Sequence, residues 1–267
     1  MPSFSFWLAY LAFGCAAGII AGLLGVGGGI VVVPALYFLF TAQGLPHEHI
    51  MQLALGTSLA TIVFTSVASF RAHDKRGAVR WDIFKSITPG IIIGSLLGSW
   101  VAAQLSTKFL KGFFIIFLYY VSVQMLLNIK PQASRQVPGT GGMFATGGVV
   151  GLVSNLVGIG GGTMTVPFLT WCNIPIHVAV GTASAIGFPI AVAGVIGYLA
   201  NGLRADHLPS LSIGYIYLPA LIGIVATSMY TAKYGAKLAH SLPVGTLKRV
   251  FALFLLAMAT RMLWSMF

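Results

Sequence analysis

Charged residues are scarce in this sequence, and acidic residues are the scarcest of all. Only 7% of the 267 residues are charged, with four Asp or Glu against fifteen Lys or Arg. An average soluble domain has about 25% charged residues, so this chain has too few to cover a surface exposed to water. With 57% hydrophobic residues, the chain is also too apolar to remain disordered. The composition therefore predicts an integral membrane protein.

The few acids and cysteines exclude several kinds of chemistry. All four acids lie in predicted loops: Glu48, Asp74, Asp82 and Asp206. This placement argues against a proton relay through buried carboxylates. Cys15 and Cys172 are far apart in apolar stretches, so we predict no disulfide, no metal site and no cofactor. The net charge of +11 is explained by basic cytoplasmic loops, so we expect lipid, and no nucleic acid, as a partner.

Long uncharged runs fill most of the chain. They cover 50–70, 86–107, 112–129, 136–203 and 207–232, and a last apolar segment at 250–267 contains one charge, Arg261. Each can supply a transmembrane helix of about 20 residues. Two segments, 8–40 and 143–171, are interrupted by the glycine triplets Gly27–Gly29 and Gly160–Gly162. A proline follows each triplet by five residues, which is typical of a broken helix.

Three sequence elements occur in the same order in both halves of the chain. They are GVGGGIVVVPAL at 25–36 and GIGGGTMTVPFL at 158–169, ALGTSLA at 54–60 and AVGTASA at 179–185, and LKGFFIIFL at 110–118 and LKRVFALFL at 247–255. Such self-similarity indicates a repeat architecture. We predict an all-α polytopic membrane protein with a first repeat over 1–133 and a second over 134–267. Each repeat would contain a glycine-broken helix pair followed by three transmembrane helices.

The positive charges indicate how the two halves are oriented. Five Lys or Arg lie within 71–85, two in the linker 130–140 and four within 233–249, and we place these segments in the cytoplasm. The loops placed outside hold Lys108, Lys111 and Arg204. Eleven positive charges inside against three outside agree with the positive-inside rule. Because the basic loop has a different position in each half, we predict that the repeats have inverted topology, as in many transporters.

The broken helices are the predicted substrate site. Glycines let a ligand approach the backbone, and the helix that follows each triplet presents the positive end of its dipole. Two such ends form a site for an anion. The site residues predicted from these elements are Gly27, Gly28, Gly29 and Pro34, with Gly160, Gly161, Gly162, Thr163, Thr165 and Pro167 in the second half. The alternative is that the glycines only let helices pack closely.

Other polar residues of the apolar runs are further candidates. Hydroxyl and amide groups that could bind an oxyanion are provided by Gly56-Thr57-Ser58, by Gly181, Thr182 and Ser184, and by Asn155. Candidates for coupling or gating are His177, Gln52, Gln124 and Arg261. Each has a structural alternative, because hydroxyls often bond to their own helix, amides often bond between helices, and arginine extends to the membrane interface.

The two GxGGGxxxxP elements, each followed by a GT(A)S element, and the LKRVF at 247–251 resemble the TauE/SafE family of sulfite exporter-type membrane permeases. This resemblance implies a protein of the prokaryotic cytoplasmic membrane that moves small sulfur-containing anions such as sulfite, sulfoacetate or other organosulfonates. We expect a transporter with no catalytic residues; a homodimer is compatible with the sequence. The alternatives are an anion channel or facilitator, and a sulfur-relay component that uses Cys15 or Cys172 as a thiol.

Overall fold

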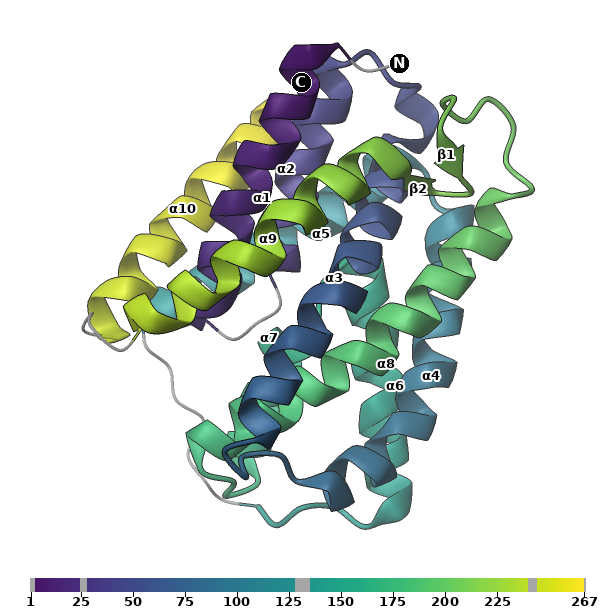
Figure 1. Ribbon diagram of the computed structural model, residues 1–267. Helices are drawn as coiled ribbons and strands as arrows, with labels where there is room; N and C mark the ends of the chain where they lie inside the picture. Colours follow the sequence, from purple (N-terminus) through teal and green to yellow (C-terminus); the bar gives the residue numbers. More distant parts are fainter. Residues whose placement is uncertain (1–2, 25–27, 128–134, 240–243, 267) are drawn as a thin grey trace.

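The computed structural model describes residues 3–24, 28–127, 135–239 and 244–266, and nearly all of them are helical (Figure 1). The helices are α1 Phe4–Leu24, α2 Gly29–Ala42, α3 Ile50–Asp74, α4 Trp81–Gln104, α5 Thr107–Leu126, α6 Thr140–Val157, α7 Gly162–Trp171, α8 Ile176–Gly202, α9 Leu218–Ala239 and α10 Val244–Trp264. A 3-10 turn, η1, covers His47–His49, and a short antiparallel hairpin joins β1 Ser212–Ile213 to β2 Ile216–Tyr217 before α9.

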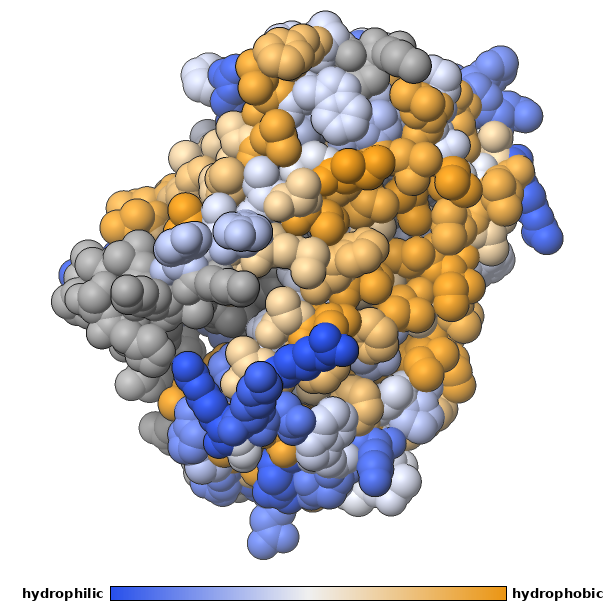
Figure 2. Space-filling view, viewed as in Figure 1, coloured by the Kyte–Doolittle hydropathy of each residue, from blue (hydrophilic) through white to orange (hydrophobic). Residues whose placement is uncertain are grey.

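Six helical segments in the described residues are long and apolar enough to cross a membrane: Phe4–Ala21, His47–Asp74, Trp81–Gln104, Thr107–Leu126, Thr140–Val157 and Ile176–Gly202. Figure 2 shows hydrophobic residues across the middle of the molecule and hydrophilic ones gathered at its ends. Large hydrophobic side chains such as Leu203 and Ile116 are 72% and 70% exposed, as expected for a surface in contact with lipid. The predicted all-α membrane fold is confirmed.

The helices pack in pairs that join one half of the chain to the other. Helices α3 and α8 lie against each other, α1 packs along α9, α6 packs along α4, and α5 packs on α10. In the repeat, α1 corresponds to α6 and α4 corresponds to α9. The α1–α9 pair and the α6–α4 pair are therefore equivalent contacts between the two halves. The helix order in each half also follows the predicted plan, with a broken pair and then three helices. The inverted orientation in a bilayer stays a prediction.

Glycines allow a close contact between α4 and α6. A Cβ atom added to Gly94 would collide with the carbonyl oxygen of Gly148, and one added to Gly90 would collide with the carbonyl oxygen of Phe144. The two backbones are therefore in direct contact. Small residues at such an interface let dispersion contacts extend along both helices, which is the main attraction between helices in lipid.

This contact predicts that Gly94→Ala destabilises the protein. The methyl group would push α4 away from the Gly148 backbone, at a cost of about 1 to 3 kcal/mol in the free energy of unfolding. Thermal unfolding in detergent should show a lower midpoint for this variant. The matched control is Gly112→Ala in α5, where the added Cβ meets nothing within 4 Å and the better helix propensity of alanine should leave the midpoint unchanged or raised. Equal midpoints for the two variants would contradict the packing described here.

Candidate functional site

The two helix breaks meet in the interior of the molecule. A Cβ atom on Gly29, the first residue of α2, would lie 2.8 Å from the carbonyl oxygen of Gly158 and 3.0 Å from the Cα of Ile159 in the second break. Ser58 of α3 donates a hydrogen bond of 2.8 Å to the same Gly158 carbonyl. The structure thus brings together the two glycine elements that the sequence singles out, although they are more than a hundred residues apart.

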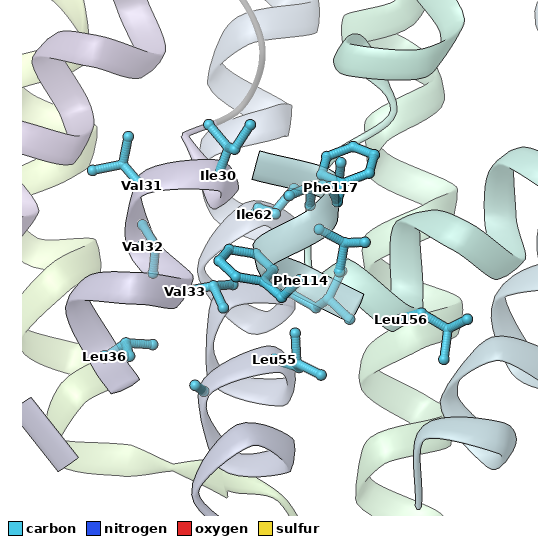
Figure 3. Close-up of a cluster of buried hydrophobic side chains, with 14 of the residues drawn as sticks. Ile30, Val31, Val32, Val33, Leu36, Leu55, Ile62, Phe114, Phe117 and Leu156 are labelled. Atoms are coloured by element: carbon cyan, nitrogen blue, oxygen red, sulfur yellow. The ribbon is translucent and has the colours of Figure 1, made fainter. Parts of the chain in front are cut away.

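Hydrophobic side chains surround this meeting point. Figure 3 shows Ile30 to Val33 of α2 beside Leu55 and Ile62 of α3 and near Phe114 of α5. All belong to one buried cluster. An apolar surrounding strengthens any electrostatic interaction inside it, because little water is present to screen the field. Polar groups left in this region therefore act strongly on a charged ligand.

A small cavity lies beside the first break. It is enclosed by residues from α1, α2, α3 and α9: Ala17, Ala21, Gly28, Val32, Thr61, Thr65, Ile224 and Ser228. Its walls therefore come from both halves of the chain. In this conformation it has room for roughly one water molecule, so any larger ligand requires the surrounding helices to move.

Gly28 places the partially positive N-terminus of α2 at the cavity. This residue is the N-cap of α2 and has a left-handed backbone with φ 75° and ψ −13°, which glycine adopts without steric strain. Glycine has no side chain to accept hydrogen bonds from the first N–H groups of the helix. The N-terminus of a 14-residue helix consequently points partial positive charge toward the cavity, where an anion would be stabilised.

Ser228 supplies an unused hydroxyl at the same cavity. Its side chain is 2% exposed, and within the described part of the chain its Oγ has no hydrogen-bond partner. A buried hydroxyl without a partner costs about 1 to 3 kcal/mol, and a hydrogen-bond acceptor in the cavity would remove this cost. Sequence patterns gave no signal for Ser228, because its neighbours in α9 form no motif.

The second break has its own unpaired polar atoms. Gly161 is the N-cap of α7, and Gly160 and Gly162 beside it are buried. In the described residues the hydroxyls of Thr163 and Thr165 are buried without a partner, as is the side-chain oxygen of Asn155. The Asn155 amide nitrogen donates to the Gly151 carbonyl at 3.0 Å. These predicted site residues therefore lie at or beside the break.

The two Gly-Thr elements instead hold the connections that precede α9 and α4. Thr57 accepts a hydrogen bond of 3.0 Å from the Tyr217 N–H, and Thr182 accepts one of 3.0 Å from the Arg80 N–H. A Cβ atom on the glycine before each threonine would collide with a carbonyl oxygen, that of Tyr215 for Gly56 and that of Ala78 for Gly181. Each half thus fixes the start of a helix in the other half, and these threonine hydroxyls are already engaged.

The remaining predicted residues are distributed over the molecule. Pro34 and Pro167 lie inside α2 and α7. Ser184 donates to the Val180 carbonyl of its own helix, and Gln52 is buried and donates to the Leu105 carbonyl. Gln124 is half-buried in α5, whereas His177 and Arg261 are exposed. Gly27 lies outside the described residues. The structure brings none of His177, Gln52, Gln124 and Arg261 to the cavity.

Lys111 is a buried cation that the sequence placed in an outer loop. It lies in the first turns of α5 and is 4% exposed. Its Nζ donates to the Tyr37 hydroxyl at 2.7 Å, to the Ser265 carbonyl at 2.9 Å and to the Ser265 Oγ at 2.8 Å. An ammonium group has three donors, so all of them are used. Lys111 therefore joins α5 to α2 and to the C-terminal end of α10, where positive charge is favoured by the helix dipole.

These observations define a class: a polytopic α-helical membrane protein with paired broken helices and a polar cavity at the interface of its halves, which is the construction of a membrane transporter. The comparison with known families then specifies it. The model of the family "Sulfite exporter TauE/SafE" matches residues 10–262, and the chain belongs to this family. It is thus an integral membrane protein of the transporter type, and we assign it to the cytoplasmic membrane of a prokaryote.

Several relatives match along almost their whole length. A probable membrane transporter protein from Haemophilus influenzae is 38% identical, over 97% of this chain and 98% of the relative. A probable membrane transporter protein from Methanocaldococcus jannaschii is 30% identical over 84% and 83%, and one from Bacillus subtilis is 27% identical over 96% of both chains. No solved structure matches this chain significantly.

The Lys111 contacts predict that Lys111→Met lowers stability. The variant keeps the length of the side chain but removes three hydrogen bonds of a charged donor, which contribute about 1.5 to 3 kcal/mol each at most. Thermal unfolding in detergent should show a midpoint lowered by several degrees. Lys108→Met, an exposed lysine one turn earlier in the same helix, serves as control and should unfold like the unmodified protein. An unchanged unfolding midpoint in Lys111→Met would show that the three hydrogen bonds do not stabilise the fold.

Proposed function

We propose that this protein is a carrier for small oxyanions, with sulfur-containing anions such as sulfite, sulfoacetate or other organosulfonates as its substrates. The observation that carries this proposal is the cavity at the first break. It is lined by the N-terminus of α2, which Gly28 leaves without a side-chain cap, and by the Ser228 hydroxyl, which has no hydrogen-bond partner within the described residues. Both are hydrogen-bond donors in a buried setting. A ligand that satisfies them must accept hydrogen bonds, and an oxyanion does so with several oxygens.

The surroundings of the cavity are suited to a negatively charged ligand. Thr61 and Thr65 line it with hydroxyls, which can be shared with an anion although they also donate to carbonyls of their own helix. The residues that enclose the cavity include no acidic side chain, so an anion meets no local repulsion. The family name points to sulfite as the first anion to test, and we carry that name to this chain as part of the proposal.

The small size of the cavity favours a carrier over an open channel. A sulfite ion has four heavy atoms, whereas the cavity holds about one water molecule in this conformation. Binding therefore needs a rearrangement of α1, α2, α3 and α9, and a carrier undergoes such a rearrangement in every cycle. A channel would conduct without saturating at low substrate concentration, so transport kinetics separate the two.

Transport by purified protein in proteoliposomes tests this proposal. We expect saturable uptake of one or more of sulfite, thiosulfate, sulfoacetate and taurine in preference to chloride, measured with and without an imposed pH gradient. Ser228→Ala should lower uptake by about ten-fold, because one hydrogen bond to a charged group contributes about 1.5 kcal/mol or more. Its unfolding midpoint should not fall, since Ser228 has no partner within the described residues.

The matched control is Ser122→Ala, another buried serine, which donates to the Leu118 carbonyl within α5. This variant should transport like the unmodified protein. Equal uptake by both serine variants would remove the cavity from the transport path. No uptake of any sulfur anion would overturn the substrate assignment.

The thiol-relay alternative predicts a dependence on cysteine. Burial raises the pKa of the Cys172 thiol, and nearby Arg135 offsets this only in part. The reactive thiolate is therefore disfavoured at neutral pH. We expect a protein with both Cys15→Ser and Cys172→Ser to keep full uptake in the same assay. Loss of uptake in a variant that still folds would favour the relay over the carrier.

A further inference from the structure

The cavity at the first break has a positional counterpart at the second. The first repeated element is displaced by 133 residues, since Gly25 corresponds to Gly158 in the sequence. This displacement relates Gly28 to Gly161, and both are N-caps of proline-containing helices. It also relates two apolar residues of the cavity wall, Ala21 and Val32, to Ser154 and Thr165.

The helices opposite the breaks correspond in the same way. A Cβ atom on Gly18 of α1 would lie 2.5 Å from the Ser228 carbonyl oxygen of α9, and one on Gly151 of α6 would lie 2.5 Å from the Ile91 carbonyl oxygen of α4. Gly18 and Gly151 are themselves 133 residues apart. Ile91 therefore occupies in the second half the place that Ser228 has in the first.

The third wall comes from α3 in the first half and from α8 in the second. The repeated ALGTSLA and AVGTASA segments are displaced by 125 residues, which relates Thr61 and Thr65 to Ile186 and Ile190. The hydroxyls therefore lie on different helices in the two sites. The first site has them on α3 and α9, and the second has them on the broken helix pair itself, at Ser154 and Thr165.

The hydroxyls of the second site are buried donors without a partner in the described residues. Ser154 and Thr165 are both fully buried, and in the described residues neither hydroxyl has a hydrogen-bond partner. The Thr165 Oγ1 lies 3.3 Å from the position of a Cβ atom on Gly161, and the Ile190 Cδ1 and Ile186 Cγ2 lie 2.9 and 3.2 Å from it. The N-terminus of α7 therefore faces a hydroxyl, and two isoleucine side chains fill the space beside it.

We infer that the second break is a second subsite for the same small oxyanion, closed in this conformation by Ile186 and Ile190. The inference rests on the proposed function. The anion would accept hydrogen bonds from the Thr165 and Ser154 hydroxyls and from the free N–H groups at the start of α7. The subsite opens when the isoleucine side chains turn away or α8 shifts. The protein thus has two unequal anion subsites, one at each break.

Two measurements test the second subsite: sulfite uptake by the full chain in proteoliposomes, and equilibrium binding of radiolabelled sulfite to the protein in nanodiscs. Thr165→Val should lower uptake by about ten-fold, while the unfolding midpoint stays equal or rises because no existing hydrogen bond is lost. Thr165→Ser should restore uptake. A residue with a purely structural role would not lower transport while leaving stability intact.

Binding stoichiometry gives the second, independent result. We expect about one sulfite per chain in the unmodified protein and about two in Ile190→Ala, which opens the subsite. Adding Thr165→Val to Ile190→Ala should return the value to about one. Ser122→Ala is the control and should bind like the unmodified protein.

The outcomes separate this inference from the proposed function. Normal uptake in Thr165→Val, together with one bound sulfite in Ile190→Ala, would overturn the second subsite and leave the carrier proposal intact. If the unmodified protein neither binds nor transports sulfite, both are overturned for this anion. Reduced uptake together with a lowered midpoint in Thr165→Val, and no gain in binding for Ile190→Ala, would show a structural role and also overturn the subsite.

Discussion

The fold depends on one constraint: backbone groups freed by an interrupted helix have to be satisfied inside the protein, because hydrocarbon offers them nothing. The chain meets this constraint by bringing its two breaks together. Gly29 packs on the Gly158 backbone, and Ser58 donates to the Gly158 carbonyl. The contact requires glycine, since a side chain at Gly29 would fill the space that the other break occupies. The placement of α3 beside both breaks follows from the same contact.

The same arrangement makes the interior chemically uneven. At the second break the freed carbonyl is bonded by Ser58, whereas at the first break the start of α2 faces a cavity. A pair of repeats with identical side chains would have identical environments at both breaks. Here the hydroxyls have moved from one wall to another, so the two breaks differ in how open they are in one and the same conformation.

The sequence was sufficient for the architecture but not for the site. A glycine triplet weakens a regular helix, so both breaks were predictable from local patterns, although the prolines that follow lie inside α2 and α7. Lys111 was misplaced because it lies at the edge of an apolar run, and its partners Tyr37 and Ser265 are 74 and 154 residues away. The sequence predicted Thr57 and Thr182 as substrate ligands but did not indicate the hydrogen bonds that their hydroxyls accept from connections in the opposite half. Partners so distant in sequence leave no periodicity to detect.

The pairing of α1 with α9 has a consequence for how the protein is made. Thr227 of α9 donates to the Leu11 carbonyl of α1, and Thr231 donates to the Cys15 carbonyl, each across 216 residues of chain. Helix α1 is therefore synthesised about 216 residues before the α9 residues that bond to it, and it has to be inserted before these contacts can form. Contacts this distant in sequence slow folding. The packing of α1 can therefore be completed only after α9 has been synthesised. A chain truncated before α9 would leave α1 without this partner.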